Sequence, residues 1–161
     1  MLQNLKNVGS GYLTKYYLAN NNPMLKDKLL MDYCGNYLNI SEFVAQHDVS
    51  LPISARLAIL SNIANGLRFL AKQKIVHMDL NLSNILVSPS FLTKIIDFGE
   101  SYCSNLDNVK YSPGFTNPFG PPEVFNSVKK FSNKSDTFSF GMILYYLVLG
   151  KLPFCPTPKL K

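Results

Sequence analysis

The sequence of 161 residues has few cysteines, no long hydrophobic run and no signal-like N-terminus. Its three cysteines, Cys34, Cys103 and Cys155, are far apart, odd in number and form no CxxC pair. This spacing argues against a disulfide framework or a zinc site and favours a reducing compartment. The longest apolar stretch, Met142–Leu149, is too short to span a bilayer. We therefore expect a cytoplasmic protein with no membrane segment.

Runs of positive charge are also missing, although the chain is basic overall. The 16 lysines and arginines exceed the 10 aspartates and glutamates, so the net charge is +6. The basic residues are scattered, with only Lys129 and Lys130 adjacent, and none of them form a run interleaved with aromatics. This pattern argues against a nucleic-acid partner. With 47% hydrophobic and 16% charged residues, the composition is that of a globular chain, and the length favours one domain with its own core.

Two strands and one half-buried helix are indicated by the residue patterns. Tyr12–Leu18 and Lys28–Tyr33 are rich in aromatic and aliphatic residues and predict a hairpin with a long connection. From Pro52 to Lys72 the apolar residues recur at steps of three and four, as a helix with one buried face requires.

A second helix has a different pattern. Phe138–Leu149 is apolar on nearly every face, which predicts a helix buried at the centre of the fold. Ser135 and Asp136 are its candidate capping residues, and Gly150 is placed to end it.

Acidic and amide side chains lie between these two helices. Asp79 and Asn84 precede a β-prone run at Ile85–Val87, and a second β-prone run at Lys94–Ile96 leads to Asp97. Two acids and an amide on the loops that flank a short hairpin can converge on one point. Their oxygens suit Mg²⁺, and one carboxylate could accept a proton.

The order of the motifs resembles the catalytic half of the eukaryotic protein kinase family, close to the Ser/Thr or tyrosine-kinase-like type. The residues that carry the likeness are His77, Asp79, Asn84, Asp97-Phe98-Gly99, Pro122-Glu123, Ser135-Asp136 and Ser139-Phe140-Gly141. The resemblance implies an α+β, protein-kinase-like fold that consists mostly of the helical large lobe with the hinge and the last small-lobe strands. Residues 1–161 would be a partial kinase domain, with 1–34 a remnant of the small lobe and hinge and 35–161 the large lobe through its central helix.

The resemblance also implies roles around the reacting phosphate. Asp79 would accept the proton of the substrate hydroxyl, and Asn84 and Asp97 would hold Mg²⁺ against the phosphates of ATP. Phe98 would pack on the side of His77 and so fix the position of Asp97.

Further residues would bind adenine or support the site. Met31 would be the gatekeeper, the backbone of Asp32 and Cys34 would meet the adenine edge, and Leu86 would lie beneath the ring. Two supporting residues are also implied, with Glu123 closing the activation segment and Asp136 supporting the backbone of the catalytic loop.

Three positions depart from the family pattern or refine it. Met78 replaces the usual arginine, so a phosphate on the activation segment would lack its normal partner. Asn81 stands where Ser/Thr-type kinases have a lysine, which removes a positive charge from the phosphate site. Thr116 looks more like the Ser/Thr class than the Tyr class.

Other family features have no counterpart in these residues. Glu42 is the first glutamate and follows the hinge, so we expect the lysine–glutamate pair that positions the phosphates to be missing. The glycines of Gly9–Tyr12 are better explained by a turn before a strand. No arginine follows Glu123 to pair with it. We therefore expect that a partner or further kinase segments must cover the large lobe.

The implied function is transfer of the ATP γ-phosphoryl group to serine or threonine hydroxyls of a protein substrate. One alternative is an inactive pseudokinase or regulatory fragment that acts by binding a protein. A second is a phosphotransferase for small molecules, against which the Pro122-Glu123 motif and Asp136 argue.

Overall fold

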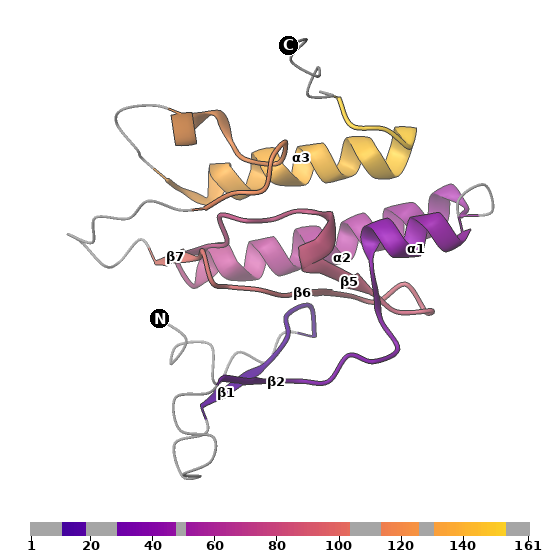
Figure 1. Ribbon diagram of the computed structural model, residues 1–161, viewed down its shortest axis with the longest axis horizontal. Coiled ribbons are helices and arrows are strands. Elements are labelled where there is room, and N and C mark those ends of the chain that lie inside the picture. The colour runs from indigo at the N-terminus through magenta and orange to yellow at the C-terminus, as the bar shows by residue number, and fades with distance from the viewer. Residues whose placement is uncertain (1–10, 19–28, 48–50, 104–113, 126–130, 154–161) are drawn as a thin grey trace, which may run out of the picture.

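The computed structural model describes residues 11–18, 29–47, 51–103, 114–125 and 131–153. Figure 1 shows these segments stacked in layers, with α3 at one side, α2 beneath it, the β5–β6 hairpin next and the β1–β2 hairpin at the opposite side. Helices and strands are both present, so the α+β fold class is confirmed.

The first layer is a two-stranded hairpin. Strand β1 (Tyr16–Leu18) pairs antiparallel with β2 (Leu29–Met31), and Tyr16 lies opposite Met31. The predicted hairpin is therefore present in shorter form. The residues just before β1 differ from the prediction, because Leu13 forms a parallel bridge with Ile95 instead.

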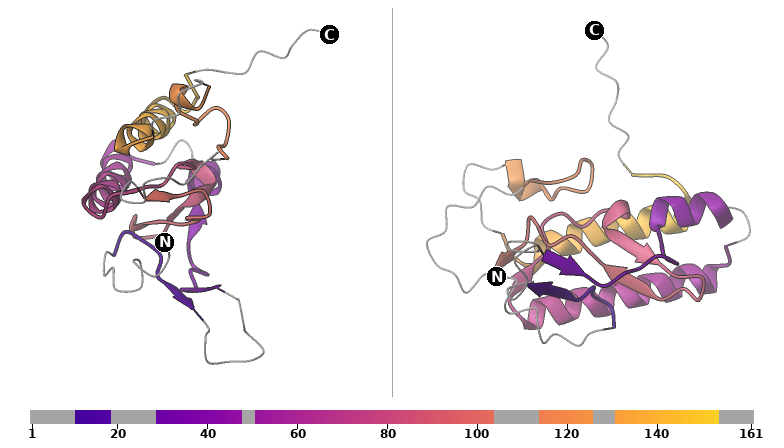
Figure 2. Two further views of the ribbon diagram at one scale, coloured as in Figure 1. Left: turned by 90° about the vertical axis from the view of Figure 1, so that its left-hand side faces the viewer. Right: turned by 60° about the horizontal axis from the view of Figure 1, so that its bottom comes forward.

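A three-stranded sheet forms the middle of the molecule. Its strands β3 (Leu38–Asn39), β5 (Ile85–Val87) and β6 (Thr93–Ile95) lie in the order β3-β5-β6, and both pairings are antiparallel. The two β-prone runs of the sequence are thus the adjacent strands β5 and β6. Figure 2 shows the β1–β2 hairpin crossing beside this sheet.

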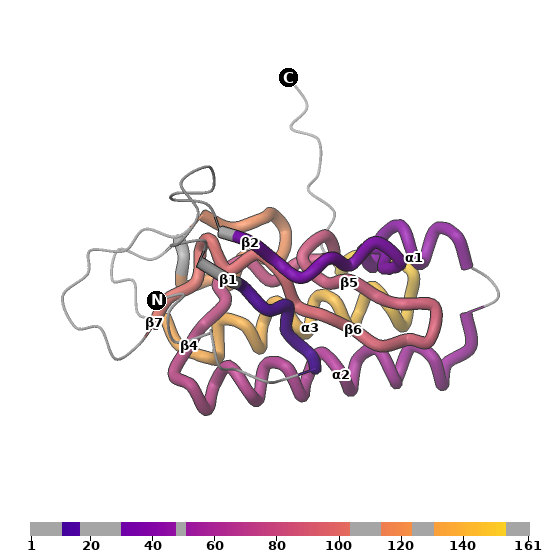
Figure 3. Tube along the Cα trace, turned by 90° about the horizontal axis from the view of Figure 1, so that it is seen from below, coloured from indigo at the N-terminus to yellow at the C-terminus, as the bar shows by residue number. Residues whose placement is uncertain are grey.

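Two helices lie between β3 and β5 in the chain. Helix α1 (Ile40–His47) starts with a reciprocal pair of hydrogen bonds, in which Glu42 N–H donates to Asn39 Oδ1 and Asn39 N–H donates to Glu42 Oε2. Helix α2 (Ile53–Lys72) is present over the predicted range, and Pro52 is its N-cap. Its buried face includes Ala55, Ile59, Ile63 and Leu70, whereas Ile53 and Leu57, two of the residues whose spacing predicted a buried face, are exposed. Figure 3 shows α2 running along one side of the β5–β6 hairpin.

Helix α2 comes unusually close to the sheet at Gly66. A Cβ built on Gly66 would lie 2.8 Å from Cδ1 of Ile95 and 3.3 Å from Cβ of Tyr12. A side chain here would force the Ile95 side chain or the helix to shift, so packing favours glycine at this position.

Helix α3 (Asn133–Leu149) lies on the far face of α2. Ser132 is its N-cap and exchanges hydrogen bonds with Ser135, so Ser135 and Asp136 lie in the first turn of the helix. The prediction that Ser135 and Asp136 cap the helix is therefore wrong, because the cap lies three residues before Ser135. Gly150 ends the helix with φ +69°, as the sequence indicated.

The prediction that this apolar helix is buried on all sides is wrong for the part of the chain that the structure describes. Ile143 and Leu147 are buried, but Leu144, Val148 and Leu149 are exposed.

Short elements complete the described fold. Strand β4 (Ile75–Val76) pairs antiparallel with β7 (Tyr102–Cys103). The 3-10 helix η4 (Leu82–Asn84) follows β4 in the chain. A second 3-10 helix, η5 (Pro122–Phe125), precedes α3. Cys34 and Cys103 are free thiols. No helix within the described ranges has the length and hydropathy to cross a membrane.

Candidate active site

The loop after β4 is fixed by a buried carboxylate from α3. Oδ2 of Asp136 accepts a hydrogen bond from His77 N–H at 2.8 Å, and Oδ1 accepts one from Met78 N–H at 3.0 Å. Met78 has φ +72°, a conformation that costs free energy for a residue with a side chain. The two hydrogen bonds offset that cost, so Asp136 holds the loop in the bend that presents Asp79.

Burial raises the pKa of Asp136 above its ordinary carboxyl value. The nearby His77 and the two backbone hydrogen bonds oppose this shift, but the loss of hydration is the larger effect.

Asp79 and Asn84 lie in contact on the same loop. Nδ2 of Asn84 donates to the backbone oxygen of Asp79 at 2.8 Å and to its Oδ2 at 3.0 Å. Since both partners accept only, the nitrogen of the Asn84 amide must face Asp79 and its oxygen must point elsewhere. The sequence-predicted pair is therefore brought together, and the Asn84 amide oxygen is not used in either of these hydrogen bonds.

Asn81 organises the backbone between these two residues. Its Oδ1 caps η4 by accepting from the N–H groups of Ser83 and Asn84, and its Nδ2 donates to the backbone oxygen of Asp79 at 3.1 Å. The side chain is buried, at 3% exposure. The sequence indicated only that Asn81 lacks the positive charge of a lysine. The structure shows that its side chain caps η4.

Thr116 reaches the same point from the segment before η5. Its hydroxyl lies 2.7 Å from Asp79 Oδ1, and its backbone N–H donates to the same oxygen at 2.8 Å. Nδ2 of Asn81 donates to the Thr116 hydroxyl at 3.0 Å. One carboxylate oxygen of Asp79 is therefore held by Thr116 and the other by Asn84.

Asp97 follows β6 with φ +61°, and its exposed carboxylate bends back so that Oδ1 accepts from Gly99 N–H at 3.2 Å. Phe98 is buried beside His77, with ring centroids 4.9 Å apart. Nε2 of His77 lies 2.9 Å from the backbone oxygen of Ile96, so this nitrogen carries the proton. The contact of Phe98 with His77 matches the arrangement expected from the sequence.

The oxygens of Asn84 and Asp97 suit a hard divalent cation. Among the described residues, no hydrogen bond uses Oδ1 of Asn84 or Oδ2 of Asp97. An amide oxygen and a carboxylate oxygen are ligands that Mg²⁺ accepts, with water and phosphate oxygens completing its shell. The described part of the chain contains no cluster of three or more His, Cys, Asp and Glu side chains that could form a protein-only metal cage.

The predicted adenine residues lie on β2, the segment after it, and β5. The side chain of Met31 is exposed, at 46%, and the Cys34 thiol lies 3.6 Å from the backbone oxygen of Asp32. Leu86 is opposite Lys94 across the β5–β6 pair, and Lys94 Nζ lies 4.0 Å from Asp32 Oδ2. This ion pair joins β6, the strand next to the one that carries Leu86, to the segment after β2.

Glu123 is anchored without an arginine. Ser135 Oγ donates to its Oε1 at 2.6 Å, so η5 is tied to the first turn of α3. No arginine follows Glu123 in the sequence, and the Ser135 hydroxyl is its hydrogen-bond partner instead.

Met78 occupies an apolar cluster. Its side chain is buried with Val76, and the partly buried rings of Tyr102, Phe115 and Phe131 pack against the two. The methionine in place of the expected arginine is therefore a core residue that contacts the segment leading to Thr116. The hydroxyl residues on which an activation-segment phosphate could lie are Ser101, Tyr102, Ser104, Tyr111, Ser112 and Thr116. Of these, Ser104, Tyr111 and Ser112 fall outside the described residues.

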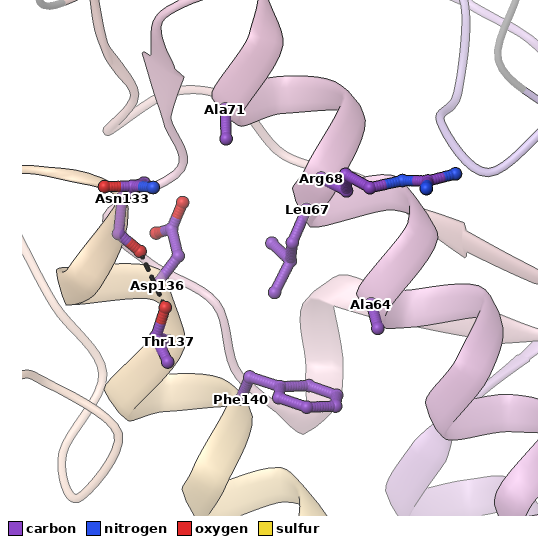
Figure 4. Close-up of a pocket in the computed structure, with 8 residues that line it drawn as sticks. All are labelled: Ala64, Leu67, Arg68, Ala71, Asn133, Asp136, Thr137 and Phe140. Atoms are coloured by element: carbon purple, nitrogen blue, oxygen red, sulfur yellow. Dashed lines mark hydrogen bonds between the residues drawn. The ribbon is translucent and has the colours of Figure 1, made fainter.

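A cavity of about 330 Å³ lies apart from Asp79, between α2 and α3. Its lining residues are Ala64, Leu67, Arg68, Ala71, Asn133, Asp136, Thr137 and Phe140. Figure 4 shows Asp136 at its wall and Arg68 pointing away from Asp136. The Asp136 carboxylate at this cavity already accepts hydrogen bonds from the backbone N–H groups of His77 and Met78.

Sequence reasoning missed two contacts with Asp79 and Asp97. The hydroxyl of Thr116 could be suspected from its class resemblance, but its bond to Asp79 spans 37 positions. The hydroxyl of Tyr16 accepts a hydrogen bond from Asp97 N–H at 2.9 Å, and no local pattern indicates it.

The sequence matches the Protein kinase domain family over residues 2–160. It is 42% identical over 108 residues to a probable serine/threonine-protein kinase of Dictyostelium discoideum, which covers 65% of this chain and 12% of that protein. It is 34% identical over 131 residues to Wall-associated receptor kinase-like 4 of Arabidopsis thaliana, covering 78% of this chain and 16% of that protein. It is also 30% identical over 124 residues to Ephrin type-B receptor 3 of Xenopus laevis, covering 71% and 12% respectively.

A solved structure, the yeast RNA Pol II CTD kinase CTDK-1 complex, matches with a TM-score of 0.79 and 20% sequence identity. The match covers 98% of this chain and 51% of the other, and at this identity it shows the fold. The matched region is a small part of each of the three curated relatives, between 12% and 16% of their length.

Proposed function

We propose that this chain, which belongs to the protein kinase domain family, binds ATP with Mg²⁺ and transfers the γ-phosphoryl group to a protein hydroxyl. The observation that supports this most strongly is the state of Asp79. Its Oδ1 is held by Thr116 and its Oδ2 by Asn84, so the carboxylate has one orientation and stands beside a potential metal ligand. A general base is useful only when it is held at the reacting proton.

Asn84 and Asp97 are the residues that would hold Mg²⁺. When bound, the ion would neutralise charge on the phosphates. Asp79 would orient the substrate hydroxyl and accept its proton, since its carboxylate is bonded directly to the proposed ligand Asn84. The backbone bonds from Asp136 would keep Asp79 in place throughout.

Serine or threonine is the proposed acceptor residue. The support is the Thr116 contact with Asp79 together with the printed descriptions of several relatives, which are serine/threonine-protein kinases. Met31, Asp32, Cys34 and Leu86 are the proposed adenine contacts. The Asp32–Lys94 pair supports this, because it links the segment after β2 to β6, and β6 pairs with the strand β5 that carries Leu86.

The decisive experiment compares the purified chain with Asp79→Asn and with the control Glu42→Gln, which changes an exposed acid on α1. With serine/threonine and tyrosine peptide pools as acceptors, we expect Asp79→Asn to lower kcat by roughly 10²- to 10⁴-fold. The Kd for Mg·ATP should stay within about twofold, because a proton acceptor contributes mainly to the transition state.

Wild-type protein that binds Mg·ATP but transfers no phosphate would favour the alternative function, a pseudokinase that acts by binding. The neutral Asn81 in the lysine position is the observation that favours this alternative. Failure to bind nucleotide at all would refute the proposed function and would favour the regulatory fragment that acts by binding a protein.

A further inference from the structure

We propose that Tyr16 is a positioning residue that holds the main chain of Asp97 in the conformation that presents its carboxylate to Mg²⁺. The proposal rests on the proposed function, because it concerns the same metal-binding aspartate. Tyr16 does not touch the phosphates in this argument; it acts through Asp97.

The first observation is the hydrogen bond between the two residues. Asp97 N–H donates to Tyr16 Oη at 2.9 Å, across 81 positions of sequence. Asp97 has φ +61°, in the left-handed region, which non-glycine residues enter only when their surroundings compensate the cost. A backbone donor that is paired in this conformation favours it over the alternatives.

The second observation is that Tyr16 is itself immobilised. Its side chain is 8% exposed, and its ring meets Phe98 edge-on, with centroids 5.9 Å apart and planes at 90°. Edge-to-face packing is a favoured geometry for two aromatic rings. The hydroxyl is therefore presented by a ring that packs on the residue next to Asp97.

The third observation is that the peptide before Asp97 is already held from the other side. Ile96 N–H donates to the backbone oxygen of Asn84 at 3.0 Å, and the Ile96 oxygen accepts from His77 Nε2. These bonds fix Ile96 to the loop that carries Asp79. The hydrogen bond from Asp97 N–H to Tyr16 Oη fixes the next residue, and its acceptor comes from β1.

The arrangement makes a mechanical connection between β1 and the metal ligand. Strand β1 pairs with β2, which runs into the segment proposed to meet adenine. A shift of the β1–β2 hairpin away from β6 would withdraw the acceptor from Asp97 N–H. The position of the hairpin thus selects whether Asp97 is held for Mg²⁺.

The test uses Tyr16→Phe, which removes only the hydroxyl and keeps the ring on Phe98. Tyr145→Phe, on half-buried α3, is the matched control. Binding of a non-hydrolysable ATP analogue is measured by calorimetry with Mg²⁺ and with EDTA. We expect Tyr16→Phe to lower the ratio of the two affinities by about three- to tenfold, as the loss of one hydrogen bond implies, with EDTA-state affinity unchanged.

Two further measurements separate positioning from general stability. Backbone amide exchange of the peptide that contains Asp97 should accelerate several-fold in Tyr16→Phe, whereas exchange at Ile75 and Val76 should not. In an Asp97→Asn background, adding Tyr16→Phe should cause no further loss of Mg²⁺ dependence, because both changes act through one carboxylate.

An unchanged affinity ratio in Tyr16→Phe, in a wild type that does require Mg²⁺, overturns the proposal. Additive losses in the double variant also overturn it. If the wild type binds no nucleotide, the proposed function fails, and amide exchange at Asp97 still decides whether the Tyr16 contact orders this residue.

Discussion

The hydroxyl of Thr116 donates a hydrogen bond to Oδ1 of Asp79 at 2.7 Å. The two residues come from different segments, one from the loop after β4 and the other from the segment before η5. Their contact means that the orientation of the proposed base depends on where the second segment lies. A substitution at Thr116 should therefore alter the orientation of Asp79, although the two residues are 37 positions apart in the sequence.

Removing the Thr116 hydroxyl should slow phosphoryl transfer. Thr116→Val keeps the backbone bond to Asp79 but loses the side-chain bond, which is charge-assisted. We expect kcat to fall by roughly tenfold with little change in the KM for ATP. Thr116→Ser keeps the hydroxyl and should retain most of the activity. Equal rates for the valine and serine variants would show that the hydroxyl is irrelevant.

Restoring the family's lysine at Asn81 should destabilise the chain. The buried Asn81 amide caps η4 and also bonds to Asp79 and Thr116, and a lysine can replace none of the accepted bonds. We expect Asn81→Lys to lower the free energy of unfolding by about 2 to 4 kcal/mol in urea titrations. The exposed neighbour Ser83→Ala is the control and should change it by less than about 0.5 kcal/mol. A lysine variant as stable as wild type would contradict the capping role.

The apolar cluster around Met78 should reject charge. Met78→Arg would place a guanidinium among Val76, Tyr102 and Phe115, whereas Met78→Leu conserves apolar volume. Both replacements keep a side chain at φ +72°, so backbone strain cancels in the comparison. We expect the arginine variant to lose at least about 2 kcal/mol and the leucine variant less than about 1.5 kcal/mol. Thermal unfolding followed by circular dichroism would measure the difference, and similar melting temperatures would argue against a buried Met78.

Asp136 should contribute a pH-dependent term to stability. Its pKa is raised by burial above the ordinary value of 3.8. Between that value and the raised pKa, the folded chain keeps a proton that the unfolded chain has released, so the free energy of unfolding falls as pH rises. Asp136→Asn lacks this term, and the stability advantage of wild type over the variant should therefore shrink as pH rises through this range. Urea titrations at several pH values would measure it, and an advantage that grows with pH would show that the sign is wrong.

Two glycines in helices should respond oppositely to alanine. A Cβ at Gly66 would lie 2.8 Å from Ile95, whereas a Cβ at Gly141 on α3 would have no neighbour within 4 Å. We expect Gly66→Ala to destabilise by about 1 to 3 kcal/mol through overpacking. Gly141→Ala should stabilise by up to about 1 kcal/mol through helix propensity. Stabilisation by both variants in chemical denaturation would contradict the close approach of α2 to β6.

Local patterns in the sequence determined helix α2, the strands β5 and β6, and the order of the motifs that identify the family. The spacing of apolar residues and of short motifs depends on neighbours along the chain, so it can be read without knowing the fold. For the same reason the sequence placed Asp79, Asn84 and Asp97 on loops beside one hairpin. The actual contact of Asn84 with Asp79 depends on a side-chain orientation that spacing does not specify.

Only the tertiary structure decided which partners these residues have. Thr116 bonds to Asp79, Ser135 bonds to Glu123, and Tyr16 accepts from Asp97. Thr116 and Asp79 are 37 positions apart in the sequence, Ser135 and Glu123 are 12 apart, and Tyr16 and Asp97 are 81 apart. The exposure of Leu144, Val148 and Leu149 on α3 could not be predicted either. An apolar sequence indicates that a helix favours burial, but it does not indicate which neighbouring element covers each face. Hydrogen-bond partners and buried faces are properties of how segments pack, and packing is settled by the whole chain at once.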